Sequence, residues 1–262
     1  MRLQVLSSGS EGNSTLVRAG ETNLLVDAGL PRLGMLARMA TAGLAEGAID
    51  HVLVTHGHLD HARSAGVVAR REKAVLHAPG SLLGQASARR ASRRSALAVD
   101  REFEVEAPRG GGPVRVLGVP LPHDCDPTLA FRLEHDGRVA VILTDMGRPD
   151  ARVARKLAGA HVLVLESNWD PEGMEKGPYP FPLRRRITGD RGHLSNAQAA
   201  EMLAMLAGAE LHTLVLAHLS RKTNTPELAL AAARGALARL GLDGRVRVLV
   251  AGQDEPLESL EV

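Results

Sequence analysis

Three histidines and an aspartate crowd into six residues of the stretch "THGHLDH", which follows the apolar run "HVLV". These residues are His56, His58, Asp60 and His61. Grouping so many polar side chains on one turn is unfavourable unless a partner neutralises them. Imidazole nitrogens and carboxylate oxygens are good ligands for Zn²⁺, Mn²⁺ or Fe. The stretch therefore predicts a metal site.

The spacing favours two metal ions rather than one. An H-x-H alternation on an extended segment sends the rings of His56 and His58 to the same side. Asp60 and His61 lie on the following turn and can reach a second metal next to the first. Two metals about 4 Å apart lower the pKa of a shared water and bind the oxygens of a hydrolytic displacement. Such a pair needs a bridging ligand, for which a carboxylate such as Asp145 is suited.

Several isolated polar residues share one context, since each closes an apolar run. Asp27 follows "NLLV", Asp145 follows "VAVILT" and His218 follows "TLVLA". His123 comes after "VLGVPLP". Strand ends at one edge of a sheet bring together residues that are far apart in sequence. We therefore expect these side chains to gather with the histidine-rich turn in one cleft.

The elements that must position these residues can be read from hydrophobic periodicity. Short β-like runs recur along the chain, and helical patterns lie at 31–44, 61–72, 80–94, 150–158, 195–207 and 226–240. The stretch "DPEGMEKGPYPFP" (170–182) is expected to be irregular. His51 and His77, which lie in two β-like runs, are expected to be structural. This mixture predicts an α/β protein with packed sheets and helices outside them, not a regular βαβ repeat.

Composition limits the class of protein. The chain has 262 residues, 44% of them hydrophobic, which is enough for one large α/β domain. No apolar run approaches the roughly 18 residues of a membrane span, and no signal peptide is recognisable, so we expect a cytoplasmic protein without a membrane partner. The single cysteine excludes an internal disulfide and a thiolate zinc finger. Aromatic residues make up only 2%, which argues against recognition by repeated base stacking.

Basic residues are unevenly spread although the net charge is only +2. The stretch "ARRASRRS" contains Arg89 and Arg90, and "PLRRRI" contains Arg184, Arg185 and Arg186. Guanidinium groups match phosphate oxygens, so both stretches could bind a nucleic-acid backbone. A solvated, arginine-rich helix face would have the same pattern. Charge alone favours that simpler interpretation for the first stretch and does not decide for the second.

"THGHLDH" matches the T-H-x-H-x-D-H signature of the metallo-β-lactamase fold, which the chain resembles from Asp27 to His218. The stretches 7–15 ("SSGSEGNST"), 165–196 and 216–229 resemble the nuclease-like YycJ/WalJ branch, to some of whose members double-stranded DNA exonuclease activity is attributed. The resemblance implies an αββα sandwich of two mixed β-sheets flanked by helices. It also implies a single metallo-β-lactamase-like domain over 1–262.

Carried onto this sequence, the resemblance implies two divalent metal ions per chain, Zn²⁺ or Mn²⁺. The ligands implied for the first ion are His56, His58 and His123. Those implied for the second are Asp60, His61 and His218, with Asp145 bridging the two ions. Asp60 would also orient or deprotonate the attacking water. Asp27 would orient a metal-binding histidine from behind.

His193 lies in "GHLSN", two residues before Ser195, which forms a capping-box pattern with Gln198. Backbone N–H groups at a helix N-terminus favour an anion such as a scissile phosphate. The late motifs resemble those of transfer-RNA 3′-processing nucleases, which implies that His193 contacts phosphate and protonates the leaving oxygen. The simpler alternative is that His193 caps the helix.

These features favour a metal-dependent hydrolase, a phosphodiesterase or nuclease that cleaves nucleic acid through a metal-activated hydroxide. DNA is favoured over RNA, and a 5′–3′ double-stranded DNA exonuclease is one form of this activity. One alternative is a hydrolase of small thioesters, esters, lactones or lactams. Another is a non-catalytic, metal-stabilised binding protein, against which the intact Asp60 argues. A homodimer is a further expectation.

Overall fold

The computed structural model describes all residues 1–262, and the chain divides into two compact units. Unit 1 comprises Met1–Gly118, Leu133–Arg138 and Gly252–Val262. Unit 2 comprises Val119–Arg132 and Val139–Ala251. None of the helices is both long enough and apolar enough to cross a membrane.

The first sheet lies in unit 1 and has seven strands in the order β14-β1-β2-β3-β4-β5-β6. Strands β14, β1, β2 and β3 pair antiparallel, whereas β3, β4, β5 and β6 pair parallel, so the sheet is mixed. The strand bounds are β1 (Arg2–Ser7), β2 (Ser14–Ala19), β3 (Thr22–Val26), β4 (His51–Leu53), β5 (Val75–Ala78), β6 (Arg93–Ala96) and β14 (Leu260–Glu261).

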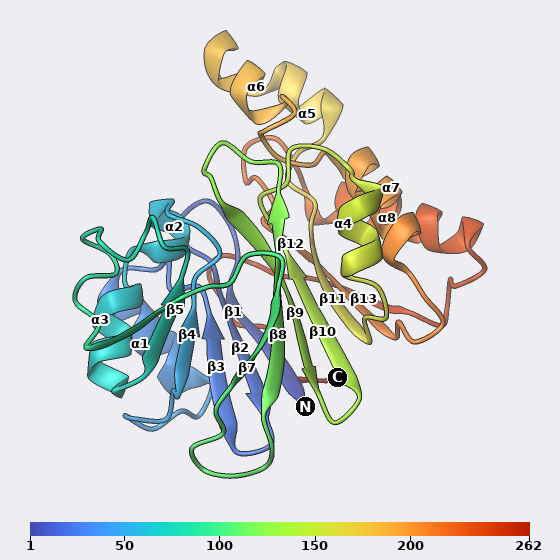
Figure 1. Cartoon of the computed structure of the whole chain (residues 1–262). Helices are drawn as coiled ribbons and strands as arrows, with labels where there is room; N and C mark the ends of the chain where they lie inside the picture. The colour runs from blue at the N-terminus through green and yellow to red at the C-terminus, as the bar shows by residue number, and fades with distance from the viewer. The chain divides into compact units, whose positions relative to one another are not determined.

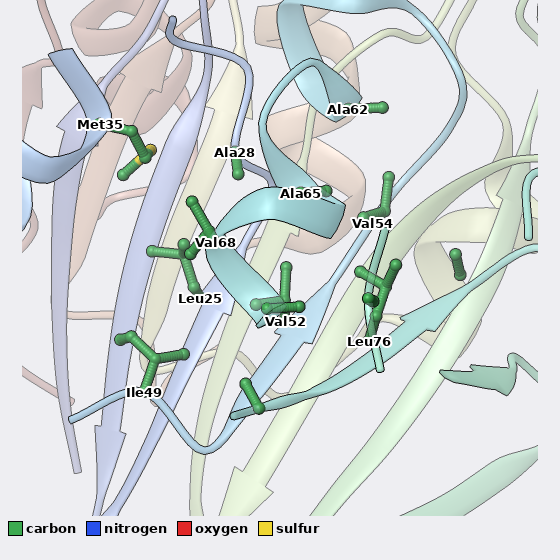
Figure 2. Close-up of a cluster of buried hydrophobic side chains, with 14 of the residues drawn as sticks. Leu25, Ala28, Met35, Ile49, Val52, Val54, Ala62, Ala65, Val68 and Leu76 are labelled. Atoms are coloured by element: carbon green, nitrogen blue, oxygen red, sulfur yellow. The ribbon is translucent and has the colours of Figure 1, made fainter. Parts of the chain in front are cut away.

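Three helices belong to unit 1, namely α1 (Arg32–Thr41), α2 (Leu59–Ala62) and α3 (Ala65–Glu72). Met35 of α1 and Val68 of α3 are buried in one apolar cluster with the strand residues Leu25, Val52 and Leu76 (Figure 2). This packing fixes β3 and β4 against the helices. It thereby holds the segments that leave the carboxyl ends of these two strands, which carry the predicted ligands of unit 1.

The second sheet also has seven strands, in the order β13-β12-β11-β10-β9-β8-β7. Strands β10 to β13 pair parallel and β7 pairs antiparallel with β8. Every residue of β11 and β12 is buried, as expected for parallel strands that are covered on both faces. The bounds are β7 (Glu102–Val105), β8 (Val114–Leu121), β9 (Thr128–His135), β10 (Arg138–Leu143), β11 (Val162–Glu166), β12 (Thr213–Ala217) and β13 (Arg247–Val250).

Five helices belong to unit 2 (Figure 1): α4 (Ala151–Lys156), α5 (Pro171–Lys176), α6 (Phe181–Ile187), α7 (Asn196–Leu206) and α8 (Pro226–Arg239). Helix α7 packs on α4, α8 and β11. Its predicted capping box is confirmed, because the Ser195 hydroxyl accepts from the backbone N–H of Gln198 and the Gln198 side chain accepts from the backbone N–H of Ser195.

Two sequence-based predictions of secondary structure are wrong. Residues 80–90 lie in consecutive turns, and Arg93 and Arg94, at the end of the expected helix 80–94, belong to strand β6. Gly84 and the serines of this stretch are poor helix formers, and pairing with β5 is a tertiary effect that periodicity does not reveal. The segment 170–182, expected to be irregular, contains α5 and the start of α6. Asp170 caps α5 by accepting from two backbone N–H groups, with Pro171 at the first helical position.

Candidate metal centre

The predicted polar residues do close strands, and three of them have unusual backbone. Asp27, Asp145 and His218 follow β3, β10 and β12 and have φ values of 63°, 64° and 55°. Residues other than glycine rarely adopt this left-handed conformation, and they keep it only where the surroundings impose it. The chain therefore turns sharply at each of these three strand ends.

In unit 1, the histidine-rich turn is built against Asp27. The ring centroid of His56 lies 4.7 Å from that of His58 and 4.3 Å from that of His61. Nδ1 of His61 donates to Asp27 Oδ2 over 2.7 Å. Thr55 donates to Asp27 from both its backbone N–H and its hydroxyl. Asp27 thus orients one predicted ligand, His61, from the side opposite its Nε2.

The turn also depends on two neighbours outside it. A Cβ atom on Gly29 would lie 1.6 Å from the carbonyl oxygen of Asp60, so only glycine allows this approach. The backbone N–H of Asn13 donates to the same carbonyl over 2.7 Å, and Asn13 Nδ2 lies 3.0 Å from His61 Nε2. Sequence reasoning did not assign a role to Asn13, although it lies in the quoted stretch "SSGSEGNST".

In unit 2, four groups that could ligate a metal converge. The ligand atoms of Asp145, Glu166, His193 and His218 all lie within 4.8 Å of one another. His123 belongs to the same region, since its Nε2 lies 3.8 Å from Asp145 Oδ1. Four of these five residues were predicted as site residues from the sequence, and Glu166 was not.

Glu166 is the last residue of β11 and is fully buried. Its Oε1 atom accepts from Nδ1 of His193 over 2.8 Å and lies 3.1 Å from Nδ1 of His218. Its Oε2 atom accepts from the backbone N–H groups of Met146 and Leu194, each over 3.0 Å. Burial raises the pKa of Glu166, but the charge of His193 and the hydrogen bonds from both histidines outweigh burial and lower the pKa to about 2. The sequence signal was available, because Glu166 ends the apolar run "HVLVLE".

His193 faces this carboxylate rather than the helix that follows it. Its side chain is 21% exposed, and its ring centroid lies 5.1 Å from those of both His123 and His218. The N-terminus of α7 is capped by Ser195, so the alternative that His193 serves as the helix cap is wrong. The predicted phosphate contact of His193 stays a prediction.

The predicted arginine contacts are distributed over two segments. Helix α6 carries Arg184, Arg185 and Arg186, of which Arg186 forms an ion pair with Asp124 with an Nε–Oδ2 distance of 2.5 Å. Arg89 and Arg90 are exposed in the turns that precede β6. Their binding of phosphate stays a prediction.

The tautomers of four predicted metal-binding histidines suit metal ions. Nδ1 of each ring faces an acceptor: the Thr55 hydroxyl for His56, Asp27 for His61, the Gly192 carbonyl for His123 and Glu166 for His218. Such bonds place the proton on Nδ1 and the lone pair on Nε2, as in metal-binding histidines generally. In His61 this lone pair faces Nδ2 of Asn13 over 3.0 Å. Burial lowers the pKa of His123 against the opposing charge of Asp145, which favours its neutral, ligating form. With aspartates completing an all-nitrogen and oxygen set, these residues fit Zn²⁺ or Mn²⁺.

The sequence and fold of the chain define its class. Residues 22–219 match the family model of the Beta-lactamase superfamily domain, and the chain belongs to this family. The metallo-β-lactamase fold expected from the sequence is confirmed, with two mixed sheets and flanking helices. A solved structure of this fold, YhfI from Bacillus subtilis, gives a TM-score of 0.72 at 16% identity and covers 98% of each chain.

Nucleases are among the curated relatives. The chain is 32% identical to the exodeoxyribonuclease YycJ of Bacillus anthracis, over 87% of this chain and 86% of the relative. It is 30% identical to the exodeoxyribonuclease WalJ of Streptococcus pneumoniae, over 87% and 85%. A ribonuclease Z from Mycolicibacterium paratuberculosis is 32% identical over 58% of this chain and 62% of its own length. The chain is thus a hydrolase of the metallo-β-lactamase superfamily with nuclease relatives, and the resemblance to the YycJ/WalJ branch is confirmed.

Proposed function

We propose that this protein is a metal-dependent phosphodiesterase that cleaves nucleic acid, most specifically an exonuclease that acts on DNA. One observation supports metal-dependent hydrolysis above all others: four buried histidines face acceptors with Nδ1, which puts the ring lone pair of each on Nε2, as metal ligation through Nε2 requires. The nucleic-acid substrate is supported by the exodeoxyribonuclease relatives, which match 87% of the chain.

The proposed cofactor is a pair of divalent ions, Zn²⁺ or Mn²⁺. The proposed ligands are those implied by the family resemblance, namely His56, His58, Asp60, His61, His123, Asp145 and His218. When bound, such ions lower the pKa of a water molecule and stabilise negative charge on phosphate oxygens. Asp27 would keep His61 in its ligating tautomer, as its hydrogen bond to Nδ1 already does.

Two residues would move the protons of the reaction. Asp60, whose side chain is 22% exposed, would accept a proton from the water that attacks phosphorus. As the new P–O bond forms and the P–O bond to the leaving group breaks, His193 would donate a proton from Nε2 to the leaving oxygen. Glu166 accepts from Nδ1 of His193, so it would hold the ring in position for this transfer.

We also propose a single domain over 1–262 that works in the cytoplasm as a homodimer. RNA remains the second candidate substrate because the ribonuclease Z relative matches more than half of the chain. The second candidate activity is hydrolysis of small thioesters, esters, lactones or lactams. This activity would not require His193 to contact a phosphate.

The deciding experiment is a nuclease panel combined with metal analysis. Purified protein, with Zn²⁺ or Mn²⁺ added, is incubated with 5′- or 3′-labelled single- and double-stranded DNA and with RNA, and bound metal is measured separately. We expect metal-dependent cleavage of DNA that is lost in Asp60→Asn, with the label pattern giving the polarity. Two bound metals without cleavage of any nucleic acid would overturn the nuclease proposal and favour a small-ester hydrolase.

A further inference from the structure

The aromatic residues of this chain are concentrated in one short segment. The whole sequence has one Trp, one Tyr and three Phe, and Trp169, Tyr179 and Phe181 lie within 13 residues of each other. The other two, Phe103 and Phe131, lie on strands β7 and β9. A chain so poor in aromatic side chains therefore places most of them around α5 and α6.

Trp169 and Phe181 line the same groove in unit 2, which has a volume of about 430 Å³. The other lining residues are Pro171, Met174 and Glu175 of α5, Arg184 and Arg185 of α6, and Thr188 just after α6, so two guanidinium groups outnumber one carboxylate. Met174 is buried and forms an apolar floor, whereas Phe181 is 67% exposed. The volume lies in the range of small-ligand sites, and aromatic faces beside guanidinium groups suit a flat, anionic ligand.

The groove is held in shape by its own contacts. Helices α5 and α6 lie side by side and project from the rest of unit 2 (Figure 1). Nη1 of Arg184 donates to the backbone carbonyl of Glu175 over 3.3 Å, which links α6 to α5. Asp170 caps α5, and a Cβ atom on Gly173 would lie 2.4 Å from the Thr223 carbonyl, so α5 lies close against the segment that precedes α8.

One end of the groove adjoins His193. Nε1 of Trp169 donates to the backbone carbonyl of His193 over 2.9 Å. Trp169 also forms a β-bridge with Ser195, the capping residue of α7. A ligand that stacks on Trp169 therefore lies near the residue proposed to contact the scissile phosphate.

The arginines of α6 give the groove a positively charged side. Helix α6 contains three arginines and no acidic residue. Arg186 is engaged by Asp124, whereas Arg185 is exposed at the groove. An unpaired nucleotide offers what this surface lacks, namely a planar base for the aromatic side chains and a phosphate for Arg185.

We propose that the groove between α5 and α6 binds one unpaired terminal nucleobase of a DNA strand, with the base stacked on Phe181 and Trp169 and an adjoining phosphate on Arg185. This inference rests on the proposed function and deepens it, because it names the part of the substrate that is recognised. Stacking of a single base requires only the aromatic side chains found here and is sequence-tolerant, since every base has a π-face.

The test uses the holoprotein and duplexes with cleavage-resistant phosphorothioate ends. One duplex carries a single unpaired nucleotide at its end, and the matched duplex carries an abasic nucleotide at the same position. Because Trp169 is the only tryptophan, its fluorescence reports directly on the groove. We expect the base-containing end to quench Trp169 and to bind about tenfold more tightly than the abasic end.

Phe181 variants separate stacking from general apolar contact. Phe181→Ala and Phe181→Leu should lose roughly tenfold in affinity for the base-containing duplex and little for the abasic one, whereas Phe181→Tyr should retain the difference. The control is Leu33→Ala, which removes an equally exposed apolar side chain from α1 and should change nothing.

Any one of four results would overturn the inference. Equal binding of the two duplexes, or an unchanged affinity in Phe181→Ala while cleavage persists, would remove the groove from recognition and leave the nuclease proposal standing. If Phe181→Ala dissociates a dimer without changing the affinity for DNA, the groove is a contact between copies of the chain. If the protein neither binds nor cleaves any DNA, the proposed function fails and this inference fails with it.

Discussion

Glu166 Oε1 accepts a hydrogen bond from His193 Nδ1 over 2.8 Å inside the fully buried end of β11. The same oxygen lies 3.1 Å from Nδ1 of His218. One carboxylate therefore sets the ring orientation of a proposed metal ligand and of a proposed proton donor. Because both rings depend on this oxygen, metal retention and proton transfer should change together when it is altered.

We expect Glu166→Gln to lower the cleavage rate and the affinity for metal by about 10- to 100-fold, the usual effect of losing an outer partner of a metal-binding histidine. The amide has nearly the same shape but carries no charge, and its NH₂ group opposes the N–H donors around it. Cleavage rate and bound metal are measured on the same preparation.

The matched control is Glu201→Gln, which neutralises an exposed acid on α7 in the same unit. It should leave both quantities unchanged. Full activity and full metal content in Glu166→Gln would show that neither histidine needs this carboxylate.

Gly29→Ala should disrupt the histidine-rich turn. The new Cβ would lie 1.6 Å from the Asp60 carbonyl oxygen and 2.8 Å from the backbone nitrogen of His61, so the backbone must move. We expect a loss of bound metal together with a lower melting temperature.

The control for Gly29→Ala is Gly34→Ala, a nearby glycine at which alanine should raise the melting temperature instead of lowering it. Gly34 lies within α1, and a Cβ there would meet only the Leu30 side chain at 3.9 Å. Alanine in a helix is favoured over glycine by about 0.5–1 kcal/mol, so this variant should be more stable and retain its metal. Similar metal content and melting temperatures in the two variants would contradict the close approach at Gly29.

Much of the candidate site was predictable because its residues carry a local signature. Asp27, Asp145 and His218 each follow an apolar run, and the structure places each one just beyond a strand end. Glu166 satisfies the same rule, yet it was missed because a single glutamate after an apolar run has no spacing motif around it. Its importance appears only when β11 lies beside β10 and β12.

The secondary-structure errors have a similar origin. The leucines and alanines between 80 and 94 suggested a helical pattern, but the backbone of Arg93 and Arg94 pairs with β5 instead. This pairing partner is distant in sequence, so no local window contains it. Conversely, the prolines and glycines of 170–182 suggested a loop, although Pro171 occupies the first turn of α5, where proline is tolerated.

The stability of the protein should fall in mild acid because of two buried histidines in unit 1. Nδ1 of His51 lies 3.0 Å from Nε2 of His77, and Nε2 of His51 lies 2.8 Å from the Glu106 carbonyl. Burial, together with the charges of His51 and Arg93, lowers the pKa of His77 from 6.5 to about 4. Burial also lowers the pKa of His51, against the raising effect of its hydrogen bond to Glu106.

The lowered pKa of His77 makes the free energy of unfolding depend on pH below 6.5. Above pH 6.5 His77 is neutral in the folded and unfolded chains, so it contributes no pH dependence. Between pH 6.5 and 4 only the unfolded chain takes up the proton, so stability falls as the pH falls. We expect His77→Gln to abolish this contribution, so that between pH 7 and pH 5 wild type loses about 2 kcal/mol more unfolding free energy than the variant. Equal losses in denaturant titrations of the two proteins would contradict the assignment.

Arg89 and Arg90 provide a test of whether the turns before β6 contact DNA. Both side chains are exposed, and the helix that would have explained them as a solvated face does not form. If each guanidinium neutralises one phosphate, Arg89→Gln/Arg90→Gln should weaken DNA binding and reduce the slope of log Kd against log salt by about two. The control Arg152→Gln/Arg155→Gln removes the same charge from exposed positions of α4 and should leave the slope unchanged. A slope that falls equally in both double variants would mean that net charge, rather than contact at these turns, governs DNA affinity.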